Sequence, residues 1–305
     1  MNLYLKYRPT TLEDIRGNEQ VTSALEGMLS NLDKCPHSFL LHGPTGCGKT
    51  TLARIIATRI GATGMDFHEL DSAHFRGIDT IREIRKQANF MTLGSKCKLY
   101  LLDESHRLTG DAQNALLKIL EDTPEHVYFV LCTTEPVKLL KTIRGRCSEF
   151  QVNPLSEREM FGLLRSVVKA EDESITKQIY EQIYQDSLGQ PRNALQILDQ
   201  VLRVDTEQRL EVAQRAAAEQ SESIALCRAL LDERSTWKQV ASILQGLKDQ
   251  DAEGIRRHVL GYANGVLIRG TTNDRAGLIL EEFRDHFYDV GSPGLTLACY
   301  TVIRN

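Results

Sequence analysis

The stretch that decides the fold reads Gly43-Pro44-Thr45-Gly46-Cys47-Gly48-Lys49-Thr50. It satisfies the pattern G-x-x-x-x-G-K-[ST] at each fixed position. The apolar run His37–His42 precedes it, and a helical pattern over Thr51–Ile60 follows it. In such a loop the glycines let backbone N–H groups turn toward phosphate oxygens, and the start of the next helix adds positive potential. Because strand and helix stand where the motif requires them, a phosphate-binding loop is favoured over a chance glycine-rich turn.

The residues of this loop have different expected roles in binding ATP. Lys49 is expected to reach the β- and γ-phosphates, and the hydroxyl of Thr50 to ligate Mg²⁺. The backbone of the loop is expected to surround the phosphates. The predicted ATP-binding residues here are Gly43, Pro44, Thr45, Gly46, Cys47, Gly48, Lys49, Thr50 and Thr51.

A pair of acids about fifty residues later completes the predicted site. The apolar run Lys98–Asp103 reads as a buried strand that ends in Asp103 and Glu104. Asp103 is expected to hold Mg²⁺ through water, and Glu104 to orient or deprotonate the attacking water. Taken alone, the two acids could simply cap a helix. Following a phosphate-binding loop, they favour ATP hydrolysis.

Short apolar strands and helical patterns alternate over the first 150 residues. Val127–Thr133 is a further buried strand, and this alternation predicts an α/β domain with a parallel sheet covered on both faces. From about Pro154 only helical patterns follow, first over residues 156–169, 174–187 and 192–204 and then to the end of the chain. Ser156 and Glu159 form a predicted capping box. We therefore expect a nucleotide-binding domain over residues 1–153, a small helical lid over 154–206 and an all-α domain over 207–305.

Charge and cysteine usage indicate which partners and which cellular compartment to expect for the protein. The net charge is −4, yet the segment Arg76–Lys98 holds six basic residues against two acidic ones. Such a local stripe matters more for DNA binding than the total charge does. Seven cysteines occur without a C-x-x-C pair, which predicts a reducing, intracellular setting and no zinc site. No apolar run is long enough for a membrane span, and the first residues lack the pattern of a secretion signal.

Several further strings resemble one family. They are Tyr7–Asn18, Leu108–Glu121 after the acid pair, Arg144–Cys147 and Gly189–Leu195. Together they resemble the AAA+ ATPase subunits of DNA sliding-clamp loaders, namely the bacterial tau/gamma subunit and the small subunits of replication factor C. The resemblance covers about residues 4–200. It implies an AAA+ P-loop domain, a helical lid and an all-α collar that joins subunits.

The resemblance assigns roles to individual residues around the nucleotide. Arg146 resembles the arginine finger that reaches the γ-phosphate bound by a neighbouring subunit, although Arg144 competes for that role. Both arginines are expected at a strand end. Arg192 resembles the lid arginine called sensor 2, and Thr134, after the strand that ends at Thr133, resembles sensor 1. The residues expected to border the adenine and ribose are Tyr7, Arg8 and Pro9. Each could instead be an ordinary surface or capping residue.

The resemblance also implies DNA contact along two helices. Arg82, Arg85 and Lys86 lie at i, i+3 and i+4, so they share one helix face. Arg76 precedes that helix, and Lys118 lies on the helix after the acid pair, where Gln113 could link DNA contact to Glu104. Such contacts would follow the phosphate backbone without reading sequence. A solvated basic face is the alternative.

The implied function is ATP-dependent loading of a sliding clamp onto primer–template DNA. The expected partners are the clamp, the DNA and other loader subunits in a homo- or hetero-oligomer, with a pentamer expected, in the cytoplasm near the nucleoid. The chain departs from the bacterial pattern because Gly61–His74 contains no cysteine and Gly145 replaces a serine. We also expect the chain to lack the long extension of the bacterial tau form. A branch-migration or helicase-type motor and a non-hydrolysing structural loader subunit are the alternatives.

Overall fold

The structure is a computed structural model. It describes residues 2–71, 77–220, 222–248, 250–268, 273–287 and 290–304, and it describes no side chains for residues 215–222. The chain forms two compact units. The first comprises Leu3–Leu163 with Gln190–Arg192, and the second comprises Leu164–Gly189 with Asn193–Asn305. The division into domains at residues 153 and 206 stays a prediction.

A five-stranded parallel sheet organises the first unit. Its strands are β1 (Ser38–His42), β2 (Phe67–Asp71), β3 (Lys98–Asp103), β4 (Val127–Thr133) and β5 (Ser148–Gln151). Their order in the sheet is β2-β3-β4-β1-β5, so β4 lies between β3 and β1. The predicted parallel sheet is confirmed, and the predicted bounds of β3 and β4 agree with the structure.

The two edge strands escaped the sequence interpretation for a physical reason. Every residue of β2 and β5 is partly or fully exposed, whereas β3 and β4 are buried along almost their whole length. An edge strand in a covered sheet loses one neighbour and tolerates polar side chains. The sequences of β2 (FHELD) and β5 (SEFQ) therefore lack the continuous apolar run by which buried strands are recognised.

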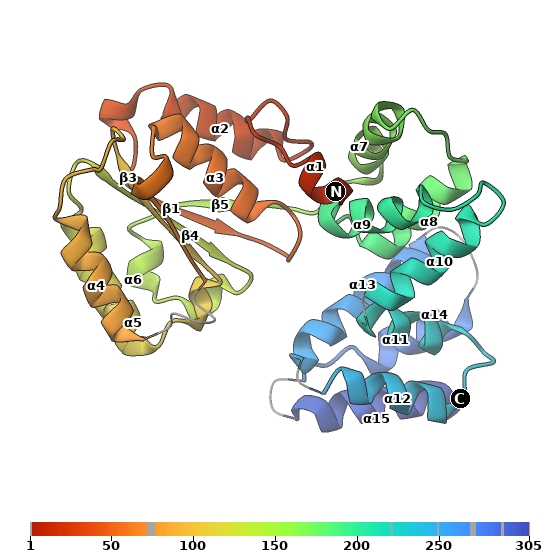
Figure 1. The fold of residues 1–305 in the computed structure, drawn as a ribbon. Helices are drawn as coiled ribbons and strands as arrows, with labels where there is room; N and C mark the ends of the chain where they lie inside the picture. The colour runs from red at the N-terminus through yellow and green to blue at the C-terminus, as the bar shows by residue number, and fades with distance from the viewer. Residues whose placement is uncertain are drawn as a thin grey trace. The chain divides into compact units, whose positions relative to one another are not determined.

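Helices cover both faces of this sheet (Figure 1). One face carries α2 (Glu19–Leu29) and α3 (Lys49–Ile60), and the other carries α4 (Ile78–Ala88), α5 (Gly110–Glu121) and α6 (Lys141–Arg144). The strands serve both layers because successive side chains point to opposite faces. In β1, Phe39 and Leu41 join the core under α2 and α3, and Leu40 joins the core under α4 and α5.

Short elements connect the strands and helices of this unit. They are α1 (Leu3–Lys6), at the start of the chain, and four single turns of 3₁₀ helix: η1 (Leu32–Lys34), η2 (Gly64–Asp66), η3 (Ser105–Arg107) and η4 (Pro136–Lys138). Turn η3 follows the predicted catalytic acids directly. Turn η4 follows β4 and ends next to Leu139, which is buried against the core under α5.

The predicted helical region is confirmed, and no strand follows Gln151 in the described part of the chain. The next helices are α7 (Glu157–Ala170), α8 (Lys177–Ser187) and α9 (Pro191–Val201). The capping box before α7 is present. The backbone N–H of Ser156 donates to Glu159 Oε2 at 2.7 Å, and the N–H of Glu159 contacts Ser156 Oγ at 3.4 Å.

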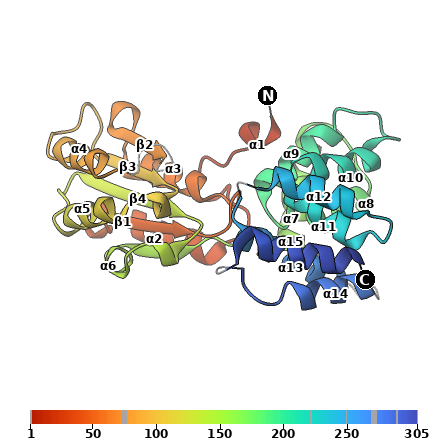
Figure 2. The same ribbon diagram turned by 90° about the horizontal axis from the view of Figure 1, so that it is seen from below.

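Six further helices complete the second unit (Figure 2). They are α10 (Arg209–Gln220), α11 (Glu222–Leu231), α12 (Trp237–Gly246), α13 (Ala252–Ile268), α14 (Asp274–Glu282) and α15 (Gly291–Arg304). Asp186 of α8 is fully buried among them. Its carboxylate pairs with Arg228 Nη2 at 2.5 Å and accepts from the hydroxyl of Tyr262 at 3.3 Å. Because an unpaired buried charge is strongly destabilising, these contacts fix α8 against α11 and α13.

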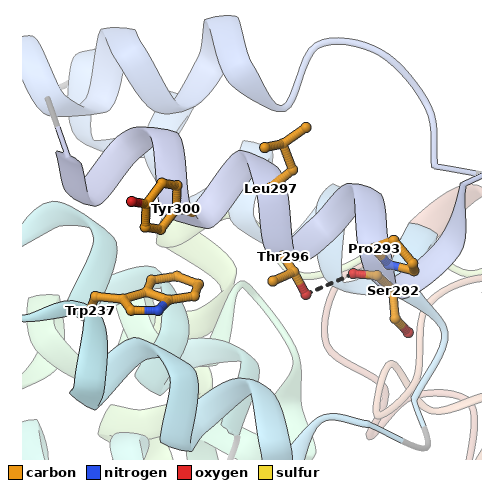
Figure 3. A pocket seen from close by; sticks show the side chains of 6 residues that line it. All are labelled: Trp237, Ser292, Pro293, Thr296, Leu297 and Tyr300. Carbon is orange, nitrogen blue, oxygen red and sulfur yellow. Dashed lines mark hydrogen bonds between the residues drawn. The ribbon is translucent and has the colours of Figure 1, made fainter.

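An apolar groove lies between α12 and α15 of the second unit (Figure 3). The indole of Trp237 meets the ring of Tyr300 edge to face, with centroids 5.0 Å apart. Leu297 is 66% exposed beside them. Among the described helices, none is both long enough and apolar enough to cross a lipid bilayer.

Candidate nucleotide-binding site

The phosphate-binding loop connects β1 to α3, as the motif predicts. Three of its glycines have positive φ, at 146° for Gly43, 75° for Gly46 and 101° for Gly48. At Gly43 a side chain is also excluded by space, because a Cβ there would lie 2.0 Å from the carbonyl oxygen of Val152. The backbone N–H of Gly43 donates to the carbonyl of Thr133 at 3.2 Å. The loop is therefore held at the carboxyl ends of β4 and β5.

Lys49 is folded back over the loop that it is expected to serve. Its Nζ donates to the carbonyl oxygens of Gly43 and Pro44, each at 2.8 Å, and the residue is 6% exposed. Burial lowers the pKa of Lys49. The ammonium group is thus desolvated and placed at the mouth of the loop. An anionic phosphate would be a better partner for it than two neutral carbonyls.

The two predicted magnesium ligands are in direct contact. The hydroxyl of Thr50 donates to Asp103 Oδ2 at 2.8 Å, which joins the start of α3 to the end of β3. These hydroxyl and carboxylate oxygens are hard donors, which Mg²⁺ prefers, and Mg²⁺ retains several waters beside a few protein ligands. The residues therefore fit a magnesium site, in which Thr50 and Asp103 would hold the ion.

Glu104 is the next residue and has the environment of a general base. Its backbone is left-handed, with φ 50°, and its side chain is 31% exposed. Burial and the nearby Asp103 carboxylate raise the pKa of Glu104, while Lys49 opposes the shift. A carboxylate with a raised pKa accepts a proton more readily than an ordinary glutamate does. The catalytic role of Glu104 stays a prediction.

Segments far apart in the chain meet around the loop within the first unit. Arg8 Nε donates to the hydroxyl of Thr51 at 3.1 Å, and the backbone N–H of Arg192 contacts the carbonyl of Gly46 at 3.4 Å. Burial lowers the pKa of Arg8, and the positive charge of Arg192 lowers it further. The structure therefore brings to the loop Arg192, predicted to contact the phosphates, and Arg8, predicted to border the adenine and ribose. Tyr7 and Pro9 flank Arg8 in the sequence, and their contact with adenine stays a prediction.

The end of β4 separates Thr133 from Thr134. Thr133 is fully buried, and its Oγ1 lies 2.9 Å from His106 Nδ1 and accepts from the backbone N–H of Glu135 at 3.0 Å. Thr134 follows the strand and is half-buried. Thr133 is thus engaged in the packing of the strand end. The sensor role of Thr134 stays a prediction.

The two candidate finger arginines do not lie on a strand-end face, so that expectation is wrong. Arg144 is the last residue of α6, and Arg146 lies in the turn before β5. Arg144 pairs with Glu149 at 2.9 Å. Arg146 pairs with Glu121 at 2.5 Å and donates to the carbonyl of Thr142 at 3.0 Å. A helical turn that ends just before β5 places the two side chains on different partners.

Arg82, Arg85 and Lys86 form an exposed basic face on α4, as the spacing predicts. Buried Ile81 and Ile84 lie on the other side of the helix. Two members have surface ion pairs with acids of the same helix: Arg82 with Asp79 at 3.1 Å and Lys86 with Glu83 at 3.8 Å. Exposed pairs of this kind are weak, so the side chains can exchange them for phosphate.

Three other residues named in the DNA-binding prediction, Lys118, Arg76 and Gln113, differ in where the structure places them. Lys118 is exposed on α5, which packs beside α4 (Figure 1). Arg76 lies outside the described residues. Gln113 is buried, donates to the carbonyls of Leu108 and Lys138 and accepts from the N–H of Leu140, so its contacts fasten α5 to the segment after β4.

Lys98 was counted in the basic stripe but does not contribute to its surface. It is 5% exposed, and its Nζ donates to the carbonyls of Gln87 and Phe90 at 2.9 and 3.1 Å. The lysine thus caps the end of α4, where unpaired helix carbonyls favour a cation.

A group of large apolar side chains is exposed near the end of α4. Four residues form this apolar tip: Met65, Phe90, Met91 and Leu93, each at least 67% exposed. The backbone beneath them is held firmly. Buried Asp66 accepts from the N–H groups of Leu93 and Ser95 at 2.9 and 3.1 Å. Exposed apolar groups on a well-anchored loop are typical of a protein-contact surface.

His106 is a residue of this site that the sequence interpretation missed. It follows the acid pair in η3 and is only 7% exposed, and its Nε2 lies 3.5 Å from carboxylate oxygens of both Glu104 and Glu135. Its position two residues after Glu104 was the available signal. Its contact with Thr133 depends on the sheet order and could not be read from the sequence.

Comparison with known proteins agrees with this geometry. A family model described as DNA polymerase III, delta subunit matches residues 64–156. The DNA polymerase III subunit gamma/tau of Mycobacterium tuberculosis H37Rv is 35% identical over 225 residues, which cover 66% of this chain and 39% of that protein. The DNA polymerase III subunit gamma of Buchnera aphidicola from Schizaphis graminum is 34% identical over 220 residues, covering 65% and 60%. The chain therefore spans less than two thirds of the length of these relatives.

Solved structures show the same fold. The Thermotoga maritima RuvB Holliday junction branch migration motor matches with a TM-score of 0.58 at 22% identity, covering 80% of each chain. This likeness shows the AAA+ architecture and no more than that. The Bacillus subtilis DNA polymerase III subunit tau is 35% identical over 221 residues. With the phosphate loop, the acid pair and the sheet order in place, these similarities support the clamp-loader ATPase family of the DNA polymerase III gamma and tau subunits for this chain.

Proposed function

We propose that the chain is an ATP-hydrolysing subunit of a clamp loader, which opens a sliding clamp and loads it on primer–template DNA during replication. The observation that carries this proposal is the contact between Thr50 and Asp103, with Lys49 and Glu104 beside it. These four side chains are the ones that triphosphate hydrolysis requires: a phosphate cation, two magnesium ligands and a base.

Each of these four residues has its own role in the proposed hydrolysis of ATP. Lys49 exchanges its two loop carbonyls for β- and γ-phosphate oxygens. Thr50 would hold Mg²⁺ through its hydroxyl and Asp103 through a bound water, and the ion would neutralise charge on the phosphates. Glu104 accepts the proton of the attacking water. Its raised pKa makes it a stronger base than an ordinary glutamate.

Further residues complete the nucleotide site in this proposal. Arg192 contacts the phosphates from the side of Gly46, and Thr134 hydrogen-bonds the γ-phosphate or the attacking water. Arg8 lies between the loop and the nucleoside, with Tyr7 and Pro9 bordering the adenine and ribose. These roles are supported by the contacts of Arg8 with Thr51 and of Arg192 with Gly46.

Hydrolysis is proposed to require a second subunit. Arg146 is placed in the role of a finger that reaches the γ-phosphate of a neighbouring copy or a related chain. A guanidinium is suited to this task because its fork of N–H donors matches the charge that builds on the phosphate in the transition state. The proposed assembly is a homo- or hetero-oligomer, with a pentamer as the favoured state, and the residue 207–305 region is the proposed collar that joins subunits.

DNA contact is assigned to the basic face of α4 together with Lys118. Four exposed cations on two neighbouring helices suit the regularly spaced phosphates of a duplex, and such contacts carry no sequence information. Arg76 belongs to the same proposal from the sequence alone.

The clamp itself is assigned to the apolar tip. A protein partner would cover the large apolar side chains of this tip, and nucleic acid would not. The proposal therefore separates two surfaces of the first unit, a cationic one for DNA and an apolar one for protein.

Two alternatives are less well supported. A branch-migration motor would share the fold, as the RuvB likeness shows, but a terminal winged helix with short strands was the feature expected of it. The described residues after Gln151 form helices only. A non-hydrolysing loader subunit is disfavoured by the complete set of Lys49, Thr50, Asp103 and Glu104.

The test is ATP hydrolysis by the full chain, measured alone, with primed DNA, and with primed DNA and a sliding clamp. Lys49→Ala should lose tight ATP binding, because it removes the phosphate-binding cation. Glu104→Gln should bind ATP and fail to hydrolyse it, while the exposed control Glu125→Gln should match the wild type. Unchanged affinity and turnover in Lys49→Ala would refute the proposed site. If the rate of ATP hydrolysis does not change when primed DNA and the clamp are added, the clamp-loader role is refuted.

A further inference from the structure

His106 is held in place by the end of β4. The hydroxyl of the preceding residue, Ser105, donates to the carbonyl of Cys132 at 3.0 Å, and both residues are fully buried. His106 Nδ1 lies 2.9 Å from Thr133 Oγ1. Two successive residues of η3 are therefore attached to two successive residues of β4. The imidazole cannot turn without breaking one of these buried contacts.

The hydrogen bonds of Thr133 determine which ring nitrogen carries the proton. Thr133 Oγ1 already accepts from the N–H of Glu135 at 3.0 Å. Its own O–H is fully buried, and within the described chain its one acceptor partner is His106 Nδ1. Because an unmade buried donor is destabilising, the hydroxyl donates to Nδ1, and the proton of a neutral imidazole resides on Nε2. Burial lowers the pKa of His106, which favours that neutral form.

The resulting Nε2–H points at the predicted base. Nε2 lies 3.5 Å from Glu104 Oε2 and 3.5 Å from Glu135 Oε1. Glu135 has another cationic partner, because Lys138 Nζ lies 2.9 Å from its second oxygen. Glu104 has no second ion pair in the described part of the chain. A small rotation of the Glu104 carboxylate would close the gap to a full hydrogen bond with His106.

We propose that His106 is a positioning residue for Glu104, in which the Nε2–H, oriented by Thr133, holds the Glu104 carboxylate in the direction needed to take a proton from water. This inference rests on the proposed role of Glu104 in hydrolysis. The general reason is that a base acts only when its oxygen lies within hydrogen-bond reach of the proton that it removes. Partners that orient a reactive group typically contribute about 10–100-fold to activity.

Two substitutions separate the two ends of the imidazole. His106→Asn places an acceptor near the Nδ1 position, so Thr133 stays paired, but it has no group that reaches the Nε2 position. His106→Gln places an amide N–H near the Nε2 position. We expect His106→Asn to lower kcat by about 10–100-fold with an unchanged ATP Kd, and His106→Gln to recover at least part of that loss. Thermal unfolding should show that both variants remain folded.

A double-variant cycle distinguishes this inference from the proposed function. In a Glu104→Gln background, His106→Asn should cause no further loss, because a positioning residue acts only through the group it positions. If Glu104→Gln keeps wild-type turnover, the proposed base is wrong, whatever His106 does. If Glu104→Gln is inactive and His106→Asn turns over normally, only the inference about His106 is overturned. A loss in His106→Asn that appears in ATP Kd rather than in kcat overturns it as well, since it would indicate a role in packing the loop.

Discussion

The proposal that Arg146 acts across a subunit boundary predicts losses of ATP turnover of two different sizes for two substitutions. In this chain the guanidinium is paired with Glu121 at 2.5 Å, and the two side chains are 36% and 43% exposed. A finger must leave this pair in order to reach a phosphate of the next subunit. We therefore compare Arg146→Ala, which removes the finger, with Glu121→Ala, which removes only its resting partner.

The losses of ATP turnover in Arg146→Ala and Glu121→Ala should differ by orders of magnitude. Exposed ion pairs contribute about 0.2–1 kcal/mol, so releasing Arg146 from Glu121 should change turnover by less than about fivefold. Removing an arginine finger lowers phosphoryl transfer by about 10³–10⁵-fold, or about 4–7 kcal/mol. Arg146→Ala should consequently hydrolyse ATP poorly in the assembly, although its own loop from Gly43 to Thr50 binds nucleotide normally.

Mixing two inactive variants tests the direction of the contact. A Lys49→Ala subunit has no working phosphate loop but offers an intact Arg146, and an Arg146→Ala subunit has the opposite defect. In a homo-oligomer assembled at random from equal amounts of both, about a quarter of all sites combine an intact loop with an intact neighbouring arginine. Hydrolysis should therefore return to about a quarter of the wild-type level.

The same experiment can refute the reasoning. If Arg146 acts within its own subunit, each Arg146→Ala site stays slow beside any neighbour, and mixing restores nothing. Arg144→Ala must be tested in parallel, because Arg144, which pairs with Glu149, is only two positions from Arg146 in the chain. Complementation by Arg144→Ala and not by Arg146→Ala would preserve the mechanism in trans and reassign the finger.

Three further predictions concern other parts of the chain. Replacing Arg82, Arg85 and Lys86 of the basic face of α4 by glutamate should weaken DNA binding on every sequence, with DNA-free hydrolysis unchanged. The slope of log K against log salt should fall by roughly 0.9 per lost phosphate contact. An unaltered slope would show that this face is only solvated and does not contact DNA. Gly43→Ala should lower the free energy of unfolding by roughly 1–3 kcal/mol more than Gly48→Ala, because both have positive φ but only the first meets a carbonyl oxygen, and equal urea midpoints would contradict this. Hydrogen bonds from the Arg256 side chain and from the N–H of Phe287 lower the pKa of Glu253 to about 2, although burial acts in the opposite direction. Its stabilisation of about 3 kcal/mol should be complete above the ordinary pKa and be lost as pH falls toward 2, so Glu253→Gln should differ from wild type at pH 7 but not near pH 2.

Sequence patterns predicted the central part of the fold because local geometry and burial determine it. The strand, loop and helix around Gly43–Thr50 follow from glycine conformations and a buried apolar run, and β3 and β4 carry continuous apolar sequences. The edge strands β2 and β5 could not be recognised in the same way, because their exposed positions hold polar side chains.

Motifs indicated which residues lie at the phosphate loop and at the end of β3, whereas the contacts that side chains make with other elements of the fold could not be read from the sequence. Thr50 and Asp103 belong to two motifs whose meeting is general to such loops, and their contact at 2.8 Å follows from it. Charge counting could not show that Lys98 caps α4 from the interior, since burial depends on tertiary packing. Nor could the sequence show that a short helix, α6, and a turn would direct Arg144 and Arg146 to different carboxylates.

The end of β4 is the structural element that the separate parts of the nucleotide site share. The sheet order places β4 between β1, which leads into the phosphate loop, and β3, which leads into the acid pair. The carbonyl of Thr133 accepts from the N–H of Gly43, and its hydroxyl contacts His106, which faces Glu104. Ligands of parallel sheets bind at the carboxyl ends of the strands, and here one buried threonine contacts both sides of that edge. If Thr134 contacts the γ-phosphate as proposed, a shift of β4 on binding would move the loop and the base together. This arrangement gives a physical reason for hydrolysis to depend on how the triphosphate is seated, beyond whether it is bound.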